Sequence, residues 1–249
     1  MTDSFGTLYG IGVGPGDPEL LTLKAHRLLQ ATPVVAYPAP DSGESFARSI
    51  VAPYLSGKQL EIPIIVPMRV ARFPAKEVYD EAAKTIAGRL KAGQDVVVLC
   101  EGDPFFYGSF MYLFERLANR FTCEVVPGIS SLMASGAMLG RPLAARNDVL
   151  TVLPAPLDDA AILAHLKSAD AVAFIKVGRH LPRLRDLLKA AHLMDRAAYV
   201  ERATLPNQKI MPLADVAHEA APYFSMVLVY SGAEDWVAAL EIAHQEGLS

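Results

Sequence analysis

Short apolar runs alternate with amphipathic stretches along the first 130 residues of the chain. Runs rich in apolar and β-branched residues predict strands at 8–13, 34–37, 59–66, 95–99 and 123–126. Apolar residues at helical spacing predict helices that begin at Asp17–Glu19 and extend over 75–90 and 110–120. Pro63 interrupts its run, which favours a strand near a sheet edge. This alternation predicts an α/β domain with a parallel or mixed sheet.

The second half of the chain continues the alternation. Apolar runs predict strands at 149–153, 171–177, 197–201 and 226–230. Helical spacing predicts helices at 159–167, 181–191, 213–220 and 234–246. The chain has no polar linker, so we expect two tightly packed α/β domains, residues 1–129 and residues 130–249.

Glycine and proline punctuate three joints between a predicted strand and the helix after it. Gly102-Asp103-Pro104 follows the strand at 95–99, and Gly16-Asp17-Pro18 repeats its order near the N-terminus. Glycine allows a sharp turn, aspartate can cap a helix, and proline suits the first helical position. Pro127–Ser131 is the third joint. Such joints leave backbone N–H groups at the carboxyl ends of strands, where open α/β sheets bind ligands.

Composition indicates a globular and mildly acidic protein. Of its 249 residues 52% are hydrophobic, and the formal net charge is −4, which argues against a general nucleic-acid binder. Cys100 and Cys123 form no metal-binding pair, so neither zinc nor a disulfide is expected. The first residues do not resemble a signal peptide, and no apolar run would span a bilayer, so we expect a cytoplasmic protein without a membrane partner.

The glycine cluster after the first predicted strand does not match the dinucleotide-binding fingerprint. With Gly10 and Gly12 as the first two glycines, the third position is Pro15, and with Gly12 and Gly14 it is Asp17. The triplet of a phosphate-binding loop, Gly-Lys-Ser or Gly-Lys-Thr, does not occur. The cluster permits close approach of a ligand to the backbone, and a purely structural tight turn fits it equally well.

The order and spacing of three motifs resemble the tetrapyrrole methyltransferases. The motifs are Gly12–Pro18 with Leu21–Ala25 behind it, Cys100–Pro104, and Val126–Ser131. Further segments resemble members of the family that act in cobalamin synthesis, namely 37–38, 102–112, 176–179, 199–203 and 223–225. The resemblance runs essentially end to end. It implies two α/β domains with a cleft between them, a parallel sheet in the first and a mixed sheet in the second, in a homodimer.

The resemblance also implies S-adenosylmethionine as the methyl donor, held by backbone as much as by side chains, and no metal. The positions that match the family's cofactor-binding residues are Pro15, Glu101, Gly102, Asp103, Phe106, Ser130 and Ser131, with Val177 and Ala203 from the second domain.

No catalytic base follows from the resemblance. Family members that methylate uroporphyrinogen carry an aspartate just after the second strand, proposed as a base, and here that position is Pro38. An electron-rich meso carbon can attack a sulfonium methyl directly, so alignment and exclusion of water become the main tasks of the enzyme. An apolar wall such as Phe105–Tyr107 is compatible with that chemistry, although each aromatic ring could equally pack in a core.

A tetrapyrrole with many carboxylates requires local positive charge on this acidic chain. Arg69 and Arg72 lie in a predicted basic and aromatic loop, and Arg179 follows a predicted strand. Arginine binds carboxylates through paired, charge-assisted hydrogen bonds. We expect these three arginines and Tyr107 to contact the substrate.

Three other functions remain open from the sequence. The same methylation could act on a cobalt-containing tetrapyrrole, because the metal would then belong to the substrate. Another methyltransferase of the superfamily could act on a protein or on ribosomal RNA, which the net acidity and the Phe-Phe-Tyr run disfavour. A non-catalytic module could bind S-adenosylmethionine or a tetrapyrrole without reaction.

Overall fold

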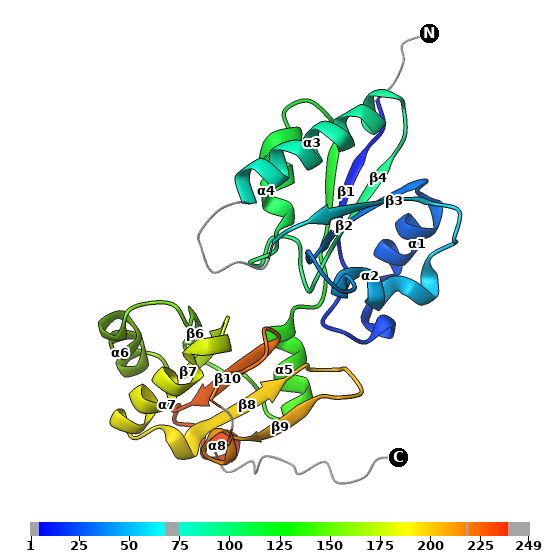
Figure 1. Cartoon of the computed structure of the whole chain (residues 1–249). Coiled ribbons are helices and arrows are strands. Elements are labelled where there is room, and N and C mark those ends of the chain that lie inside the picture. Colours follow the sequence, from blue (N-terminus) through cyan, green and yellow to red (C-terminus); the bar gives the residue numbers. More distant parts are fainter. Residues whose placement is uncertain (1–4, 68–74, 218, 239–249) are drawn as a thin grey trace. The chain divides into compact units, whose positions relative to one another are not determined.

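The computed structural model describes residues 5–67, 75–217 and 219–238 (Figure 1). Its internal contacts divide the chain into two compact units, Met1–Ser130 and Ser131–Ser249. The predicted domains, residues 1–129 and 130–249, remain a proposal. None of the described helices is both long and apolar enough to cross a membrane.

The first unit contains a five-stranded sheet in which all neighbouring strands are parallel, as predicted. The strand order is β3-β2-β4-β1-β5. Its strands are β1 (Leu8–Gly12), β2 (Val34–Ala39), β3 (Leu60–Ile65), β4 (Val96–Cys100) and β5 (Cys123–Val126). The strand with Pro63 is an edge strand, as predicted, where the missing N–H of proline costs no ladder bond.

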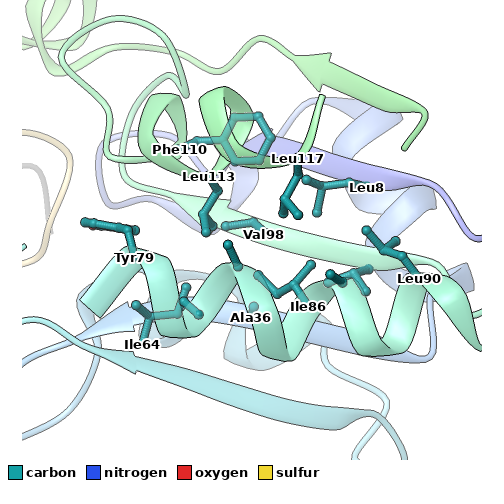
Figure 2. Close-up of a cluster of buried hydrophobic side chains, with 14 of the residues drawn as sticks. Leu8, Ala36, Ile64, Tyr79, Ile86, Leu90, Val98, Phe110, Leu113 and Leu117 are labelled. Carbon is teal, nitrogen blue, oxygen red and sulfur yellow. The ribbon is translucent and has the colours of Figure 1, made fainter. Parts of the chain in front are cut away.

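Helices cover both faces of this sheet, because successive residues of its buried strands point to opposite sides. Val96 and Val98 of β4 pack with α3 (Ala75–Lys91) and α4 (Phe110–Leu117) (Figure 2). Val97 and Leu99 pack with the helices of the other face, α1 (Leu23–Ala31) and α2 (Phe46–Val51). A strand buried on both faces has no polar side, as the uninterrupted apolar run of β4 predicts.

The strand order creates a topological switch at the carboxyl end of β4. The helices that follow its two neighbours, α1 after β1 and α2 after β2, lie on one face of the sheet, and α4 after β4 lies on the other. The connections therefore diverge around β4, and the carboxyl ends of the strands at such a switch point are the usual ligand site of open α/β sheets.

The second unit contains a mixed five-stranded sheet, also as predicted, with the order β6-β7-β10-β8-β9. Only β6 and β7 pair in parallel. The strands are β6 (Leu150–Pro154), β7 (Ala171–Ile175), β8 (Ala197–Glu201), β9 (Lys209–Pro212) and β10 (Ser225–Tyr230). The helices are α5 (Ser131–Leu139), α6 (Asp159–Ser168), α7 (Leu181–Ala190) and α8 (Asp235–Ala238).

Several element boundaries differ from the prediction. The helix expected from Asp17 is a short 3₁₀ turn, Pro18–Leu20, and α1 begins only after Thr22, whose hydroxyl accepts a hydrogen bond from the N–H of Ala25 at 3.2 Å. The start of α1 is therefore set by Thr22, whose side chain caps the first turn of the helix.

The helix predicted at 213–220 is wrong, since the described residues contain only a 3₁₀ turn there, Leu213–Asp215. Two elements, α2 and β9, were not predicted, because each is short and lacks a distinct apolar period. Of the helix predicted at 234–246, residues 239–246 lie outside the described part of the chain.

Candidate functional site

Three loops meet through glycines at the carboxyl edge of the parallel sheet, after β1, β4 and β5. The backbones of Gly14 and Gly102 pair, with the N–H of Gly102 donating to the carbonyl oxygen of Gly14 at 2.8 Å. A Cβ on Gly12 would lie 2.5 Å from both the Gly102 oxygen and the Cα of Gly128. Only glycine fits where backbones approach this closely, so the predicted motifs after the three strands form one packed junction.

The Asp103 side chain holds two of these loops together. Its Oδ1 accepts hydrogen bonds from the N–H groups of Phe105 and Phe106 at 2.9 and 3.0 Å. Its Oδ2 accepts one from the N–H of Gly128 at 3.0 Å. The predicted helix cap is therefore wrong, because α4 begins only at Phe110 and Asp103 instead closes an Asx-type turn. Pro104 likewise lies in this turn and outside the helix.

The neighbouring Glu101 carboxyl group lies at the switch point itself. Burial raises the pKa of this carboxyl, while backbone hydrogen bonds from Glu101 and from Ala47 in α2 lower it. Beneath it, burial also raises the pKa of the Cys100 thiol, which therefore stays protonated at neutral pH.

The aromatic residues that follow form an exposed surface. Phe105, Phe106 and Tyr107 are 48%, 36% and 46% exposed, so none of the three is a core residue. Phe105 packs its ring edge-on against Phe114 of α4 at a centroid distance of 5.1 Å. Phe106 and Tyr107 pack on each other at 5.1 Å. An exposed, braced aromatic surface is suited to contact with a flat or apolar ligand.

The structure therefore brings the predicted positions of the first unit to one edge. Pro15 is buried in the loop after β1, and Ser130 follows the junction after β5. Ser131 begins α5, as the third motif predicts. The members of this group within the first unit are Pro15, Glu101, Gly102, Asp103, Phe106 and Ser130.

The two positions predicted in the second unit, Val177 and Ala203, also share a sheet edge. They follow β7 and β8, which run parallel to each other on either side of β10. Val177 is fully buried and Ala203 is 7% exposed. The turn around Ala203 is tightly constrained, because Arg202 and Thr204 both have positive φ and the N–H of Arg202 donates to the Phe224 oxygen at 2.8 Å.

A buried carboxylate anchors that turn, and the sequence reasoning did not assign it a role. Glu201 is 1% exposed and accepts hydrogen bonds from the Tyr199 hydroxyl at 2.8 Å and from Nη1 of Arg202 at 2.5 Å. The Tyr199 hydroxyl also lies 3.1 Å from that of Ser225. The charged residue inside an otherwise apolar strand was the sequence signal for this network.

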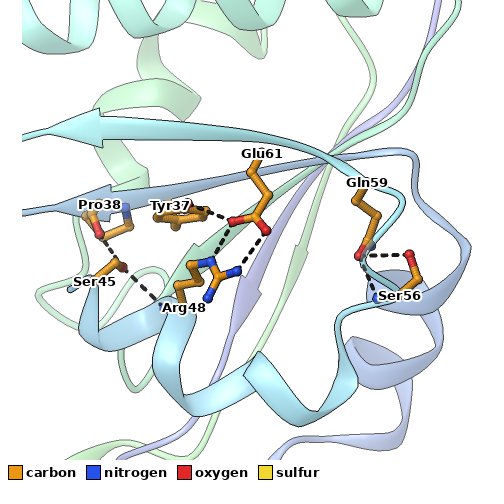
Figure 3. Close-up of polar contacts among 7 residues, drawn as sticks. All are labelled: Tyr37, Pro38, Ser45, Arg48, Ser56, Gln59 and Glu61. Carbon is orange, nitrogen blue, oxygen red and sulfur yellow. Dashed lines mark hydrogen bonds and ion pairs between the residues drawn. The ribbon is translucent and has the colours of Figure 1, made fainter.

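A second unpredicted network lies beside the end of β2 (Figure 3). Glu61 accepts hydrogen bonds from the Tyr37 hydroxyl at 2.7 Å and from Nε and Nη2 of Arg48 at 2.5 and 2.9 Å. The Arg48 hydrogen bonds are the main cause that lowers the pKa of Glu61. This bidentate ion pair holds α2 against the sheet. The same helix carries the N–H of Ala47, which lies near Glu101.

The predicted substrate-binding arginines are described only in part. Arg69 and Arg72 lie outside the described residues. Arg179 is exposed on the 3₁₀ turn Gly178–His180. The pKa of His180 is lowered, first by burial and then by the charges of Arg183 and Arg179. Arg183 itself binds the carbonyl oxygens of Ala155 and Leu157 and the carboxylate of Asp159, so it is already engaged.

A groove of about 690 Å³ opens between α3 and α4 in the first unit. Three carboxylates and two cations line it, so it does not offer the basic patch expected for a polycarboxylate. Its lining residues are Lys76, Glu77, Tyr79, Asp80, Tyr112, Glu115 and Arg116. Among the described residues, no three or more histidine, cysteine, aspartate or glutamate side chains are grouped so that they could hold a metal ion.

Comparison with known proteins identifies the family. The profile described as Tetrapyrrole (Corrin/Porphyrin) Methylases matches residues 7–217. The chain is 41% identical over 232 residues to the precorrin-2 C(20)-methyltransferase of Sinorhizobium sp, covering 90% of this chain and 95% of that protein. It is 32% identical over 228 residues to the cobalt-precorrin-2 C(20)-methyltransferase of Salmonella typhimurium, covering 90% and 96%.

Other relatives differ in length or are more distant. The chain is 41% identical over 235 residues to the cobalamin biosynthesis protein CobIJ of Mycobacterium bovis, covering 91% of this chain and 46% of that protein, so it spans about half of that relative's length. The crystal structure of a uroporphyrin-III C-methyl transferase from Thermus thermophilus, complexed with S-adenyl homocysteine, matches with a TM-score of 0.66 at 26% identity and covers 90% of this chain and 97% of that one. The family resemblance read from the three motifs is thereby confirmed, and this chain belongs to the tetrapyrrole (corrin/porphyrin) methylases.

Proposed function

We propose that this chain transfers a methyl group from S-adenosylmethionine to C20 of precorrin-2, giving precorrin-3A in cobalamin biosynthesis. The observation that carries the proposal is the 41% identity to a precorrin-2 C(20)-methyltransferase over 90% of this chain and 95% of that protein. A second candidate is the same transfer to cobalt-precorrin-2, which the 32% identity to the Salmonella enzyme favours.

S-adenosylmethionine fits the junction of loops in the first unit. The glycines let the three loops pack against one another at the carboxyl ends of the strands, and the Asp103 carboxylate holds the loop after β4 in place. The related structure with S-adenyl homocysteine supports the same class of ligand. When bound, S-adenosylmethionine supplies a methyl group that its positive sulfur has already activated.

The residues of the chain would then bind, orient and exclude water. The proposed positions in the three loops, among them Pro15 and Ser130, would fix the cofactor through backbone groups. Phe106 would provide an apolar contact. In the second unit, Val177 and Ala203 remain the proposed cofactor positions. Ser131 remains one too, at the start of α5. No catalytic metal is part of the proposal.

Tyr107 and the arginines would recognise the tetrapyrrole. The exposed ring of Tyr107 offers a surface for the macrocycle, and the exposed Arg179 offers a guanidinium for a carboxylate. Arg69 and Arg72 remain the proposed partners for further carboxylates. The homodimer, which the family resemblance implies, and the cytoplasmic location are further parts of the proposal.

Methyl transfer with a labelled donor tests the proposal. The full chain is incubated with S-adenosylmethionine carrying a ¹³C-methyl group, with precorrin-2 and with cobalt-precorrin-2 in parallel. Label at C20 of precorrin-2 supports the first function, and faster labelling of the cobalt compound supports the second. Binding of both ligands without transfer of label would establish a non-catalytic binding module instead.

A further inference from the structure

Strained backbone lies beside both proposed cofactor positions of the second unit. Lys176, which has a φ of 57°, directly precedes Val177. Arg202 and Thr204, with φ of 50° and 72°, flank Ala203. Residues other than glycine rarely adopt such angles, β-branched residues least of all. Strain of this kind persists only where surrounding contacts impose it, and it concentrates at functional sites.

Ala203, at the centre of its turn, leaves its backbone polar groups unused within the described chain. The residue is 7% exposed, yet neither its N–H nor its C=O forms a hydrogen bond with any residue that the structure describes. Buried backbone groups are nearly always paired. A donor and an acceptor that stay unpaired in a buried turn are available to a ligand.

The Glu201 carboxylate ties the two ends of this turn together. Its Oε1 lies 2.5 Å from Nη1 of Arg202, where the turn begins, and 3.5 Å from Nζ of Lys209, where β9 begins. Its Oε2 accepts a hydrogen bond from the Tyr199 hydroxyl at 2.8 Å. The carboxylate thus joins the end of β8 to the start of β9 and closes the loop between them.

Hydrogen bonds inside the loop extend this constraint to both neighbours of Ala203. The N–H of Thr204 donates to Oε1 of Gln208 at 3.0 Å. The N–H of Leu205 donates to the carbonyl oxygen of Arg202 at 3.0 Å. Because the residues on either side of Ala203 are held in this way, a displacement of Arg202 would also displace Ala203.

Packing alone does not account for a charged residue at the end of β8. Glu201 is 1% exposed, and the other residues of this strand are buried and, apart from Tyr199, aliphatic. Removing a carboxylate from water costs free energy even when it is paired, and apolar residues of similar volume often stabilise a fold equally well. An ion pair does add a defined geometry, and here that geometry belongs to the turn around Ala203.

We propose that Glu201 is a positioning residue for S-adenosylmethionine, an inference that rests on the proposed function and on Ala203 as one of its cofactor positions. Glu201 itself does not contact the ligand. Its carboxylate holds Arg202 and the loop up to Lys209 in the conformation that presents the backbone of Ala203. The ligand then meets a turn that is already ordered, so less binding free energy is spent on ordering it.

Glu201→Gln tests the inference, because the amide keeps the size of the side chain and removes the charge that holds Arg202 and Lys209. The Tyr199 hydroxyl can still bond to the amide, since a hydroxyl can donate or accept. We expect the affinity for S-adenosylmethionine, measured by calorimetry, to fall about 10- to 100-fold. In methyl transfer, the KM for S-adenosylmethionine should rise by a similar factor while kcat stays close to that of the parent, because the turn binds the ligand equally before and during reaction.

Asp148→Ala is the matched control within the same unit. Asp148 accepts hydrogen bonds from the Tyr230 hydroxyl at 2.9 Å and from the N–H of Ala145 at 2.8 Å. It precedes β6, which runs in the same direction as β7 and β8, so it lies at the opposite edge of the sheet from Ala203. This variant should unfold at a lower urea concentration than the parent and should bind S-adenosylmethionine like the parent.

Arg202→Gln removes the other member of the ion pair from a partly exposed position, which keeps the inference testable if Glu201→Gln does not fold. The double variant should bind S-adenosylmethionine about as weakly as the weaker single variant, because both substitutions remove the same contact.

Parent-like affinity in Glu201→Gln or, if that variant does not fold, in Arg202→Gln overturns the inference and leaves the proposed function standing. Losses of affinity that multiply in the double variant, or an equal loss in Asp148→Ala, overturn it in the same way. A parent protein that does not bind S-adenosylmethionine overturns both the inference and the proposed function.

Discussion

Gly12 and Gly128 lie back to back, so that a Cβ on Gly12 would sit 2.5 Å from the Cα of Gly128. Gly12 ends β1 and Gly128 follows β5, and the Gly102 oxygen from the loop after β4 lies against both. A side chain on Gly12 would therefore have to displace at least one of the other two loops. The junction therefore fixes the relative positions of three of the motifs by which the family was identified.

Gly12→Ala should destabilise the first unit and weaken binding of S-adenosylmethionine. The added methyl group meets backbone atoms on two sides, and overpacking of this kind costs about 1–3 kcal/mol of unfolding free energy. Urea denaturation and calorimetric titration measure the two effects.

Gly88→Ala is the matched control for this glycine substitution. Gly88 lies within α3, and a Cβ there would meet nothing within 4 Å. We expect this variant to gain about 0.5–1 kcal/mol, because alanine favours a helix over glycine. Equal stability of Gly12→Ala and the parent would mean that the three loops are not locked as described.

Asp103→Asn should keep the hydrogen bonds within the loop after β4 and remove the one that joins this loop to Gly128. An amide oxygen can still accept from Phe105 and Phe106, but the amide nitrogen cannot accept from the N–H of Gly128. We expect a loss of about 1.5–3 kcal/mol in stability and about tenfold in affinity for S-adenosylmethionine.

Asp158→Ala provides the comparison for Asp103→Asn. Asp158 caps α6 in the second unit through one hydrogen bond from Ala161 at 2.8 Å. Loss of this capping hydrogen bond should lower the free energy of unfolding by about 1 kcal/mol without changing the affinity for S-adenosylmethionine. If Asp103→Asn binds S-adenosylmethionine like Asp158→Ala does, the bridge to Gly128 has no part in the site.

The Arg48–Glu61 pair predicts a pH dependence of stability. Hydrogen bonds from Arg48 lower the pKa of Glu61 in the folded chain below its ordinary 4.5. Its contribution to stability is therefore present above about pH 5 and is lost as the pH falls through the folded-state pKa. Both side chains are a third or so exposed, so this contribution should be about 1 kcal/mol or less.

Unfolding free energies of the parent and of Glu61→Gln, compared across the acidic range, test this dependence. The difference between the two proteins should be largest near neutral pH and should shrink as the pH falls. A difference that stays constant down to about pH 3 would show that the pair does not titrate as described.

We expect Arg69 and Arg72, which lie outside the described residues, to bind carboxylates of the substrate. Replacing Arg72 by alanine should weaken precorrin-2 binding by about one to two decades, because a lost charge-assisted bond costs roughly 1.5–3 kcal/mol, and replacing both Arg69 and Arg72 should weaken it by about two to four decades. The affinity of the parent should fall as salt is raised, and that of the double variant should fall less steeply.

Cofactor affinity should barely change in this double variant, because the proposed cofactor loops lie elsewhere in the chain. Unaltered precorrin-2 binding over a range of salt concentrations would mean that the loop is only surface. The carboxylate partners would then have to be sought near Arg179.

The strands and most long helices followed from the sequence because their apolar period is unambiguous. The run of β4 and the spacing of Phe110, Leu113 and Leu117 are such cases. The starts of helices were less certain, because Asp103 and Asp17 fit either a helix cap or an Asx turn, and only the loop beyond decides between them.

The polar networks could not be predicted in the same way. Glu61 lies thirteen residues from Arg48 and twenty-four from Tyr37, so only the folded sheet brings the three together. The partners of Asp103 illustrate the same limit, since Gly128 is twenty-five residues away. Sequence spacing thus located the loops, whereas their contacts depended on the strand order.

The most direct test of the account is the position of the methyl group in the product. The full chain is supplied with ¹³C-methyl S-adenosylmethionine and precorrin-2, and the product is examined by mass spectrometry and ¹³C NMR. The account predicts one added methyl group, with the label bonded to C20 and the C20 proton lost. A label on another ring carbon, or a substrate recovered without label from a folded protein that binds S-adenosylmethionine, would contradict it.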